Sequence, residues 1–236
     1  SFSLLPALFV KPGNERWRDS FRLVHPRLVH LRAFTGLASS VLVTYAFVNI
    51  PFAETYSLVF MMPLFITVMS VLLLRERVDL VRWAMLALGF AGVMLVVRPG
   101  FRELQLGHLA ALACAFFGAS TTTILRVIAG SEKRVSLIAL PALYLIVINA
   151  GLMLPGFVWP SLTQFVLLAI SGSLVGMGHL LLIAATRNAP ASQVAPIQYV
   201  QIVWAIGLGA FFYAEYPDLL AYAGLGAVVL SGLVNI

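Results

Sequence analysis

The sequence predicts an all-α fold, namely a polytopic transmembrane helical bundle built from two repeats of inverted topology. The prediction depends on composition, on the spacing of apolar runs and on an internal repeat. Of the 236 residues, 61% are hydrophobic and only 10% are charged, whereas a soluble domain carries roughly 25% charged residues. This composition cannot provide a water-soluble surface, so most of the surface must face lipid.

Eight apolar runs follow one another along the chain. A helix that crosses the hydrocarbon core needs roughly 20 apolar residues. The runs cover 28–50, 54–74, 80–97, 106–127, 136–154, 162–186, 192–213 and 218–236. We therefore expect eight spanning helices. Segment 1–10 is too short to span and lacks the basic start of a signal peptide, so we interpret it as the end of a further helix.

The basic residues indicate the orientation. When the loops are assigned alternately to two sides, thirteen Lys and Arg fall on one side and only Arg98 and Arg102 on the other. Cytoplasmic loops carry the excess of basic residues. We expect a multi-pass protein of the bacterial inner (plasma) membrane with its basic loops in the cytoplasm. The net charge of +6 does not indicate a nucleic-acid partner, because the charges lie between apolar segments.

The internal repeat appears when the sequence is shifted by 139 residues without a gap. Asn49 then falls on Asn188, Glu76 on Glu215 and Asp79 on Asp218. Each matched pair of linkers lies on opposite sides of the membrane, so the repeats are inverted, with 1–103 as an N-terminally truncated first repeat and 104–236 as the second. Inverted repeats are typical of secondary transporters, which exchange inward-open and outward-open states.

The first repeat contains AFVNIPFAETYSLVFMMPLFITVMSVLLLRERVDLVRWAMLALGFAGVMLVVRPG, and the second contains AATRNAPASQVAPIQYVQIVWAIGLGAFFYAEYPDLLAYAGLGAVVLSG. Both resemble the EamA-type module of the drug/metabolite transporter superfamily. The resemblance implies a ten-helix fold whose first helix and most of whose second are absent from this chain. It also implies transport of amino acids, nucleobase-like metabolites or drugs, with riboflavin, S-adenosylmethionine and carboxylates carried by some branches.

A solute site is expected near mid-membrane, at the interface of the repeats. The polar and aromatic residues that reach this depth are Tyr45, Thr122, Asn149, His179, Gln198, Gln201 and Trp204. The set offers amides, hydroxyls and aromatic rings but no fixed charge. An ionic solute would lose its hydration there without gaining a counter-ion. We therefore expect a neutral or zwitterionic metabolite moved by alternating access, as an exporter or exchanger, with packing of helices as the alternative role for these residues.

The acidic residues all lie at helix ends or in loops. Glu76 and Glu215 are expected to accept hydrogen bonds from the N-terminal amides of the helix that follows each of them, with a gating role as the alternative. Intramembrane carboxylates are the usual proton relay, so their absence at mid-depth predicts transport without proton coupling, unless the expected missing helices supply a carboxylate. Pro63, Pro141 and Pro196 lie inside predicted helices, where each would free a carbonyl.

Other classes of function are less well supported. Cys114 is the single cysteine and the four histidines share no ligand spacing, so no metal site and no cofactor are expected. Ser120 and His179 form on paper the dyad of an intramembrane serine protease, but the inverted repeat has no role in such an enzyme. A passive channel or structural membrane protein is the other alternative. The expected partners are a small-molecule substrate and the lipid bilayer, and a homodimer is left open by the small residues Ala223, Ala227 and Ser231.

Overall fold

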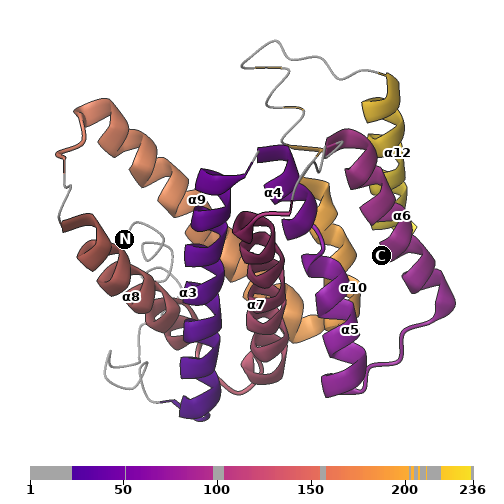
Figure 1. The fold of residues 1–236 in the computed structure, drawn as a ribbon. Coiled ribbons are helices and arrows are strands. Elements are labelled where there is room, and N and C mark those ends of the chain that lie inside the picture. The colour runs from indigo at the N-terminus through magenta and orange to yellow at the C-terminus, as the bar shows by residue number, and fades with distance from the viewer. Residues whose placement is uncertain are drawn as a thin grey trace. The chain divides into compact units, whose positions relative to one another are not determined.

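The computed structural model describes residues 23–50, 52–97, 104–154, 158–201, 203–204, 207, 211 and 219–234. Regular structure in this part of the chain is helical throughout (Figure 1). The elements are α3 (Pro26–Asn49), α4 (Phe52–Val59), α5 (Met62–Leu74), α6 (Leu80–Val97), α7 (Leu106–Ile128), α8 (Arg134–Met153), α9 (Leu162–Asn188), α10 (Ala191–Ile197), the 3-10 helix η3 (Gln198–Val200) and α12 (Leu219–Val234).

Five helical stretches are long and apolar enough to cross a membrane. They are Pro26–Asn49, Glu54–Leu74, Leu106–Ile128, Arg134–Met153 and Leu162–Asn188, and Leu80–Leu95 and Tyr222–Ser231 are shorter apolar helices. The prediction of a polytopic helical bundle is thereby confirmed. The predicted run 192–213 begins as α10 and η3, and its later part falls largely outside the described residues. The inverted relation of the repeats and their boundary at residue 103 stay predictions.

Pro63 explains why the second span is divided into α4 and α5. Proline has no N–H, so the carbonyl of Val59 lacks its donor four residues on. The chain tightens at this point, where the Met61 amide donates to the Leu58 carbonyl at 3.0 Å. At the other end of α5, Arg75 adopts a left-handed conformation with φ 55° and ψ 31°. This turn ends the helix and places Glu76 in the linker that follows.

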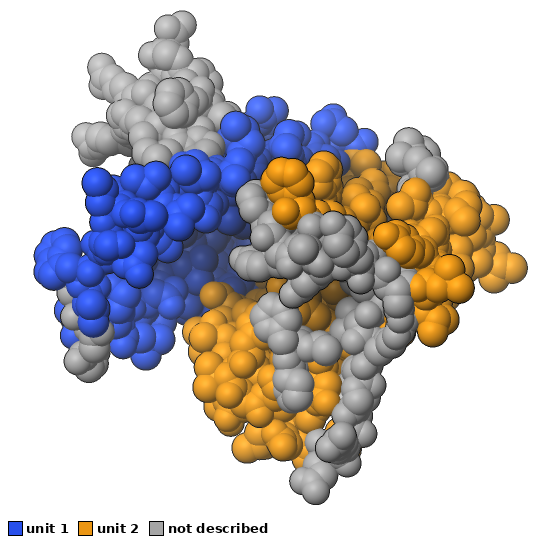
Figure 2. Space-filling view, turned by 90° about the horizontal axis from the view of Figure 1, so that it is seen from above, with its two compact units in different colours: residues 1–37, 124–188 blue, residues 38–123, 189–236 orange. Residues whose placement is uncertain are grey.

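The chain divides into two compact units, which Figure 2 colours separately: unit 1 comprises residues 1–37 and 124–188, and unit 2 comprises residues 38–123 and 189–236. The core of unit 1 gathers apolar side chains of α3, α7, α8 and α9: Val29, Leu125, Ile128, Ala129, Leu137, Ile138 and Ile183. Unit 2 has a cluster of Phe60, Leu86, Val93, Tyr199 and Val228. These units do not coincide with the two sequence repeats, because each unit combines residues from both sides of the predicted boundary at residue 103.

Helices α6 and α12 pack closely within unit 2. A Cβ atom added at Gly92 would lie 2.6 Å from the carbonyl oxygen of Gly224, and one at Gly89 would lie 2.6 Å from Cδ2 of Tyr199. Ala227 and Ser231, two of the small residues noted in the sequence, border these glycines. Small residues thus bring the two helix backbones together, as is common between transmembrane helices.

Candidate functional site

The seven predicted solute-site residues are distributed over both units. Tyr45, Thr122, Gln198, Gln201 and Trp204 belong to unit 2, whereas Asn149 and His179 belong to unit 1. A single cavity lined by all seven residues would have to join the two units, and it stays a prediction.

Within unit 2, the predicted residues differ in exposure. Trp204 is 69% exposed and Tyr45 is 45% exposed, and Gln201 is also exposed. Thr122 is buried, and its hydroxyl donates to the Gly118 carbonyl within α7 at 3.2 Å. Gln198 opens the 3-10 helix, in which residues three apart are aligned on one side, so that Gln198 and Gln201 share a face. This arrangement presents two amides beside an exposed indole.

Tyr199, the neighbour of Gln198, has a different role. Its side chain is fully buried in the cluster of α6 and α12, and its hydroxyl has no hydrogen-bond partner among the described residues. The ring fills the space that Gly89 leaves open. Tyr199 therefore belongs to the apolar core, although it follows Gln198 directly in the sequence.

Within unit 1, Asn149 and His179 are both exposed and both use their own helix backbone. Nδ2 of Asn149 donates to the Leu145 carbonyl at 2.8 Å, and Nδ1 of His179 lies 3.1 Å from the Val175 carbonyl oxygen. The contact fixes Nδ1 of His179 as the protonated nitrogen whenever the ring is neutral. Nε2 is then the acceptor that His179 can offer to a solute.

Glu76 accepts hydrogen bonds from amides, but those of a different helix from the expected one. Its Oε1 accepts from the Ala191 amide at 3.1 Å and its Oε2 from the Ser192 amide at 3.2 Å. These residues open α10, 115 residues further along the chain. At the start of the next helix, α6, it is Oδ1 of Asp79 that accepts a hydrogen bond, from the Arg82 amide. Only the tertiary fold places the carboxylate at the positive end of α10. Glu215 lies outside the described residues.

Glu132 performs the same task in unit 1. Its Oε1 accepts from the amides of Val24 and His25, directly before α3, and its backbone carbonyl accepts from Nη2 of Arg187 at 2.7 Å. Arg126 in turn donates to the Thr186 carbonyl at the end of α9. These contacts supply donors and acceptors to helix ends that would otherwise lack them.

Arg32 is the functional candidate that the sequence reading missed. It lies inside the predicted run 28–50 but was counted with the basic residues of the loops. In the structure it is the seventh residue of α3, which begins at Pro26, and it is only 3% exposed. Its Nη1 donates to the Leu137 carbonyl of α8. Pro141 lies four residues after Leu137 and has no N–H to offer that carbonyl. The sequence did contain a signal for this contact, because Pro141 predicts a carbonyl without its donor and Arg32 is a strong donor inside a predicted helix.

A buried acid–base pair was also missed. Oε2 of Glu54 in α4 lies 2.8 Å from Nε2 of His108 in α7, and both residues are less than 9% exposed. Nδ1 of His108 accepts from the Gln105 amide at 2.9 Å. Because Nδ1 is an acceptor, the neutral ring carries its proton on Nε2 and donates it to Glu54. His108 thereby closes the start of α7 in the manner of a capping box.

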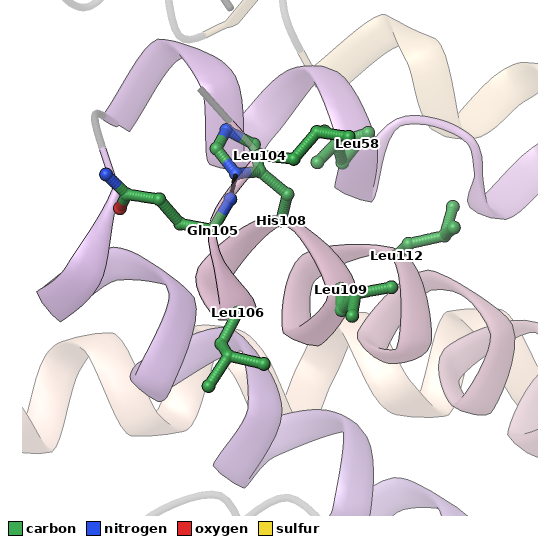
Figure 3. Close-up of a pocket in the computed structure, with 7 residues that line it drawn as sticks. All are labelled: Leu58, Leu104, Gln105, Leu106, His108, Leu109 and Leu112. Carbon is green, nitrogen blue, oxygen red and sulfur yellow. Dashed lines mark hydrogen bonds between the residues drawn. The ribbon is translucent and has the colours of Figure 1, made fainter. Parts of the chain in front are cut away.

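A cavity of about 520 Å³ adjoins this pair (Figure 3). It lies in unit 2 and is lined by Leu58, Leu104, Gln105, Leu106, His108, Leu109 and Leu112. The leucines make its wall almost wholly apolar, and Leu104, Leu106 and Leu109 are themselves exposed. Such a wall fits hydrocarbon better than a polar metabolite. Among the residues that the structure describes, no group of His, Cys, Asp and Glu is arranged to hold a metal ion.

Comparison with known proteins identifies the family. The model of the EamA-like transporter family matches residues 1–98 and 105–236. The pseudopaline exporter CntI of Pseudomonas aeruginosa is 27% identical over 203 residues, which are 85% of this chain and 72% of that protein. The riboflavin transporter of Vibrio cholerae is 26% identical, with 77% of this chain and 61% of that protein covered. The S-adenosylmethionine uptake transporter of Rickettsia bellii is 26% identical, with 99% and 78% covered.

A solved crystal structure supports the fold. It has a TM-score of 0.84 and 20% sequence identity, and the match covers 99% of this chain and 82% of that chain. The family and its named relatives are transporters, so the protease-like alternative is set aside in favour of a multi-pass membrane transporter for a small molecule. The chain belongs to the EamA-like transporter family of the drug/metabolite transporter superfamily.

Proposed function

We propose that this protein is a secondary transporter that moves a small neutral or zwitterionic metabolite across the bacterial inner membrane by alternating access, as an exporter or exchanger. The observation that carries the proposal is the family match over almost the whole chain. The sequence repeat at a shift of 139 residues supports the mechanism, because inverted repeats allow the two access states to interconvert. The named relatives are a pseudopaline exporter, a riboflavin transporter and an S-adenosylmethionine uptake transporter, which supports a small-molecule solute.

The solute site that we propose includes Gln198, Gln201 and Trp204 of unit 2. The two amides share a face of η3 and its continuation, and the exposed indole of Trp204 follows within one helical turn. An indole stacks on flat rings, and paired amides bind a polar edge. A nucleobase-like solute or an amino acid with an aromatic side chain matches this combination.

Counterflow in proteoliposomes tests the site. Gln201→Ala and Trp204→Ala should each lower the rate severalfold or more, because a hydrogen bond removed from a desolvated site costs about 1–3 kcal/mol. Trp159→Ala is the matched control, since Trp159 is 83% exposed ahead of α9 and belongs to no proposed site. Normal counterflow in both site variants would place the solute elsewhere, and loss of folding in both would assign these residues to helix packing.

Thiol labelling in intact cells tests the orientation. In a Cys114→Ala background, cysteines at Arg77 and Lys133 should be shielded from an impermeant reagent, whereas one at Phe157, which lies outside the described residues, should react. Cys114 is itself buried, with its Sγ 3.3 Å from the Ser39 hydroxyl. Labelling of the Arg77 and Lys133 positions from outside would reverse the proposed topology.

An uncoupler tests the energetics. The proposal of exchange or facilitated diffusion requires that counterflow persists when the proton gradient is collapsed. The Glu54–His108 pair is the observation that favours the second candidate, a proton-coupled carrier, because buried carboxylates in membrane spans serve as proton relays. Complete loss of counterflow with the uncoupler, together with its persistence in a Glu54→Gln variant, would favour that candidate.

A further inference from the structure

Arg32 is a cation inside the candidate span Pro26–Asn49, and it is almost completely buried in unit 1. A guanidinium has five N–H donors in a fixed plane. Nη1 donates to the Leu137 carbonyl of α8, whereas the buried Nε has no hydrogen-bond partner. Ionisable side chains within transmembrane segments are costly and usually mark the path of a solute or an ion.

The carboxylates of the described chain are engaged at other places. Glu54 contacts His108, Glu76 accepts from α10, Asp79 accepts from Arg82 and Glu132 accepts from the residues before α3. In the part of the chain that the structure describes, the charge of Arg32 therefore meets a backbone carbonyl and no counter-ion. A buried ion without a partner costs several kcal/mol, which favours binding of an anionic group.

The contact with α8 explains one donor of Arg32 but not its charge. Because Pro141 leaves the Leu137 carbonyl without its intrahelical donor, some side chain must donate to it. A neutral glutamine could supply that hydrogen bond. The packing of the helices therefore does not explain why this buried donor carries a full positive charge.

His179 is the titratable neighbour whose charge acts on Arg32 from α9. It is either neutral or cationic, so it adds no negative charge. His30, two residues before Arg32 in α3, forms a hydrogen bond through Nδ1 with the Tyr144 hydroxyl of α8 at 2.9 Å. Among the described residues, these two titratable groups near Arg32 are thus neutral or cationic.

We propose that Arg32 binds the carboxylate of the transported solute, so that the solute is a carboxylate-bearing metabolite. This inference rests on the proposed function and narrows its solute class from neutral or zwitterionic compounds to those with a carboxylate. Nε and the adjacent Nη2 form the edge of the guanidinium opposite Nη1, and this edge matches the two oxygens of a carboxylate. The Nη1 contact with Leu137 holds the guanidinium plane in place for that interaction.

A structural role of Arg32 must be separated from the binding role, and Pro141 makes this possible. In Pro141→Ala, the new amide of residue 141 can donate to the Leu137 carbonyl, so Arg32 is no longer needed for that hydrogen bond. Arg32→Gln and Arg32→Lys are therefore tested in the Pro141→Ala background. Pro141→Ala alone is the matched control, since Pro141 belongs to no proposed binding site.

The probes are three pairs of solutes that differ in a carboxylate: phenylalanine and phenylalaninamide, nicotinate and nicotinamide, and orotate and uracil. Melting temperature of the purified protein reports binding, and counterflow in proteoliposomes reports transport. At least one carboxylate should raise the melting temperature of wild type and of Pro141→Ala, while its partner does not. Arg32→Gln in the Pro141→Ala background should lose this shift and lower counterflow about tenfold or more, with Arg32→Lys in between.

Three results would overturn the inference: equal shifts from both members of every pair, an unchanged carboxylate shift in the Arg32→Gln double variant, or no shift of wild type with any carboxylate. Counterflow of an uncharged probe by wild type would sustain the proposed transport function in each case. A carboxylate shift that depends on Arg32, with no counterflow of any probe, would support the binding site and refute transport of these solutes.

Discussion

The two compact units hold their helices together in different ways. In unit 1, charged side chains reach backbone atoms of other elements: Arg32 the Leu137 carbonyl, Arg126 the Thr186 carbonyl and Arg187 the Glu132 carbonyl. In unit 2, glycines allow close approach, with Gly89 against Tyr199, Gly92 against Gly224, Gly107 against Ile50 and Gly118 against Met62. A Cβ added at Gly130, Gly151 or Gly178 of unit 1 would meet no atom within 4 Å.

The difference teaches which motions each unit allows. A charge-assisted hydrogen bond to a carbonyl is directional, so it fixes both the rotation and the height of a helix. A contact between small residues is weakly directional and permits small sliding movements of packed helices. We infer that unit 2 allows sliding only where such contacts stand alone, because Glu76 accepts from the Ala191 and Ser192 amides and the Ser231 hydroxyl donates to the Met85 carbonyl of α6 at 2.7 Å.

The largest effect is expected at the buried pair of unit 2. His108→Leu removes the partner of Glu54 and the acceptor of the Gln105 amide. Leaving a buried charge without its partner costs about 3–5 kcal/mol. Thermal unfolding of the purified protein in detergent should show a strong fall in melting temperature.

The control for that experiment is the double variant Glu54→Leu/His108→Leu, in which no charge is left behind. Replacing both members of a buried pair by apolar side chains is often nearly neutral. The double variant should thus recover most of the lost stability. A double variant as unstable as His108→Leu would show that apolar packing, and not the charge, determines the loss.

In unit 1, Arg32→Leu should destabilise the protein by about 1–3 kcal/mol, because the buried Leu137 carbonyl then has no donor. Pro141→Ala should reduce this loss, because it restores an intrahelical donor to the same carbonyl. The two substitutions should be strongly non-additive in a double-mutant cycle of melting temperatures. Strict additivity would mean that Arg32 and Pro141 do not act on the same carbonyl.

The glycine packing of unit 2 is tested by Gly92→Ala. The added Cβ would meet a backbone oxygen at 2.6 Å, and backbone cannot rotate away as a side chain can. Overpacking of this kind costs about 1–3 kcal/mol. Gly226→Ala in α12 is the matched control, since nothing lies within 4 Å and alanine is the better helix former by about 0.8–1.0 kcal/mol. Destabilisation by both to the same extent would contradict the close contact of α6 with α12.

The smallest effects are expected from the two capping glutamates, one in each unit. Glu76→Ala and Glu132→Ala each remove an acceptor from a helix N-terminus, at a cost of about 0.5–2 kcal/mol. Glu76→Gln and Glu132→Gln keep an oxygen acceptor and should lose less. If the Gln variant melts at a lower temperature than the Ala variant at either position, capping is ruled out at that position. At Glu76, this result would favour the alternative gating role.

The sequence predicted most helix boundaries well, because the limits of apolar runs are local. The predicted run 80–97 coincides with α6, and the run 106–127 ends one residue before α7 does. Predicted contacts were less accurate. Glu76 was expected to serve the next helix and serves α10 instead, since the choice of amide depends on which helix start lies nearby in space. Arg32 lies inside the predicted run 28–50 but was counted with the basic residues of the loops, because the pattern of charges alone does not show that its side chain is buried between helices.

The sequence by itself determined the class of this protein: an apolar helical chain of the EamA-like family, with the helix lengths of a membrane bundle and a repeat detectable at one shift. These properties follow from composition and periodicity, which are local. Only the tertiary structure decided which polar groups meet, as with Arg32 and the carbonyl freed by Pro141, or Glu54 and His108. The physical reason is that a buried polar atom must find its partner among all the helices that surround it, and sequence separation does not restrict that choice.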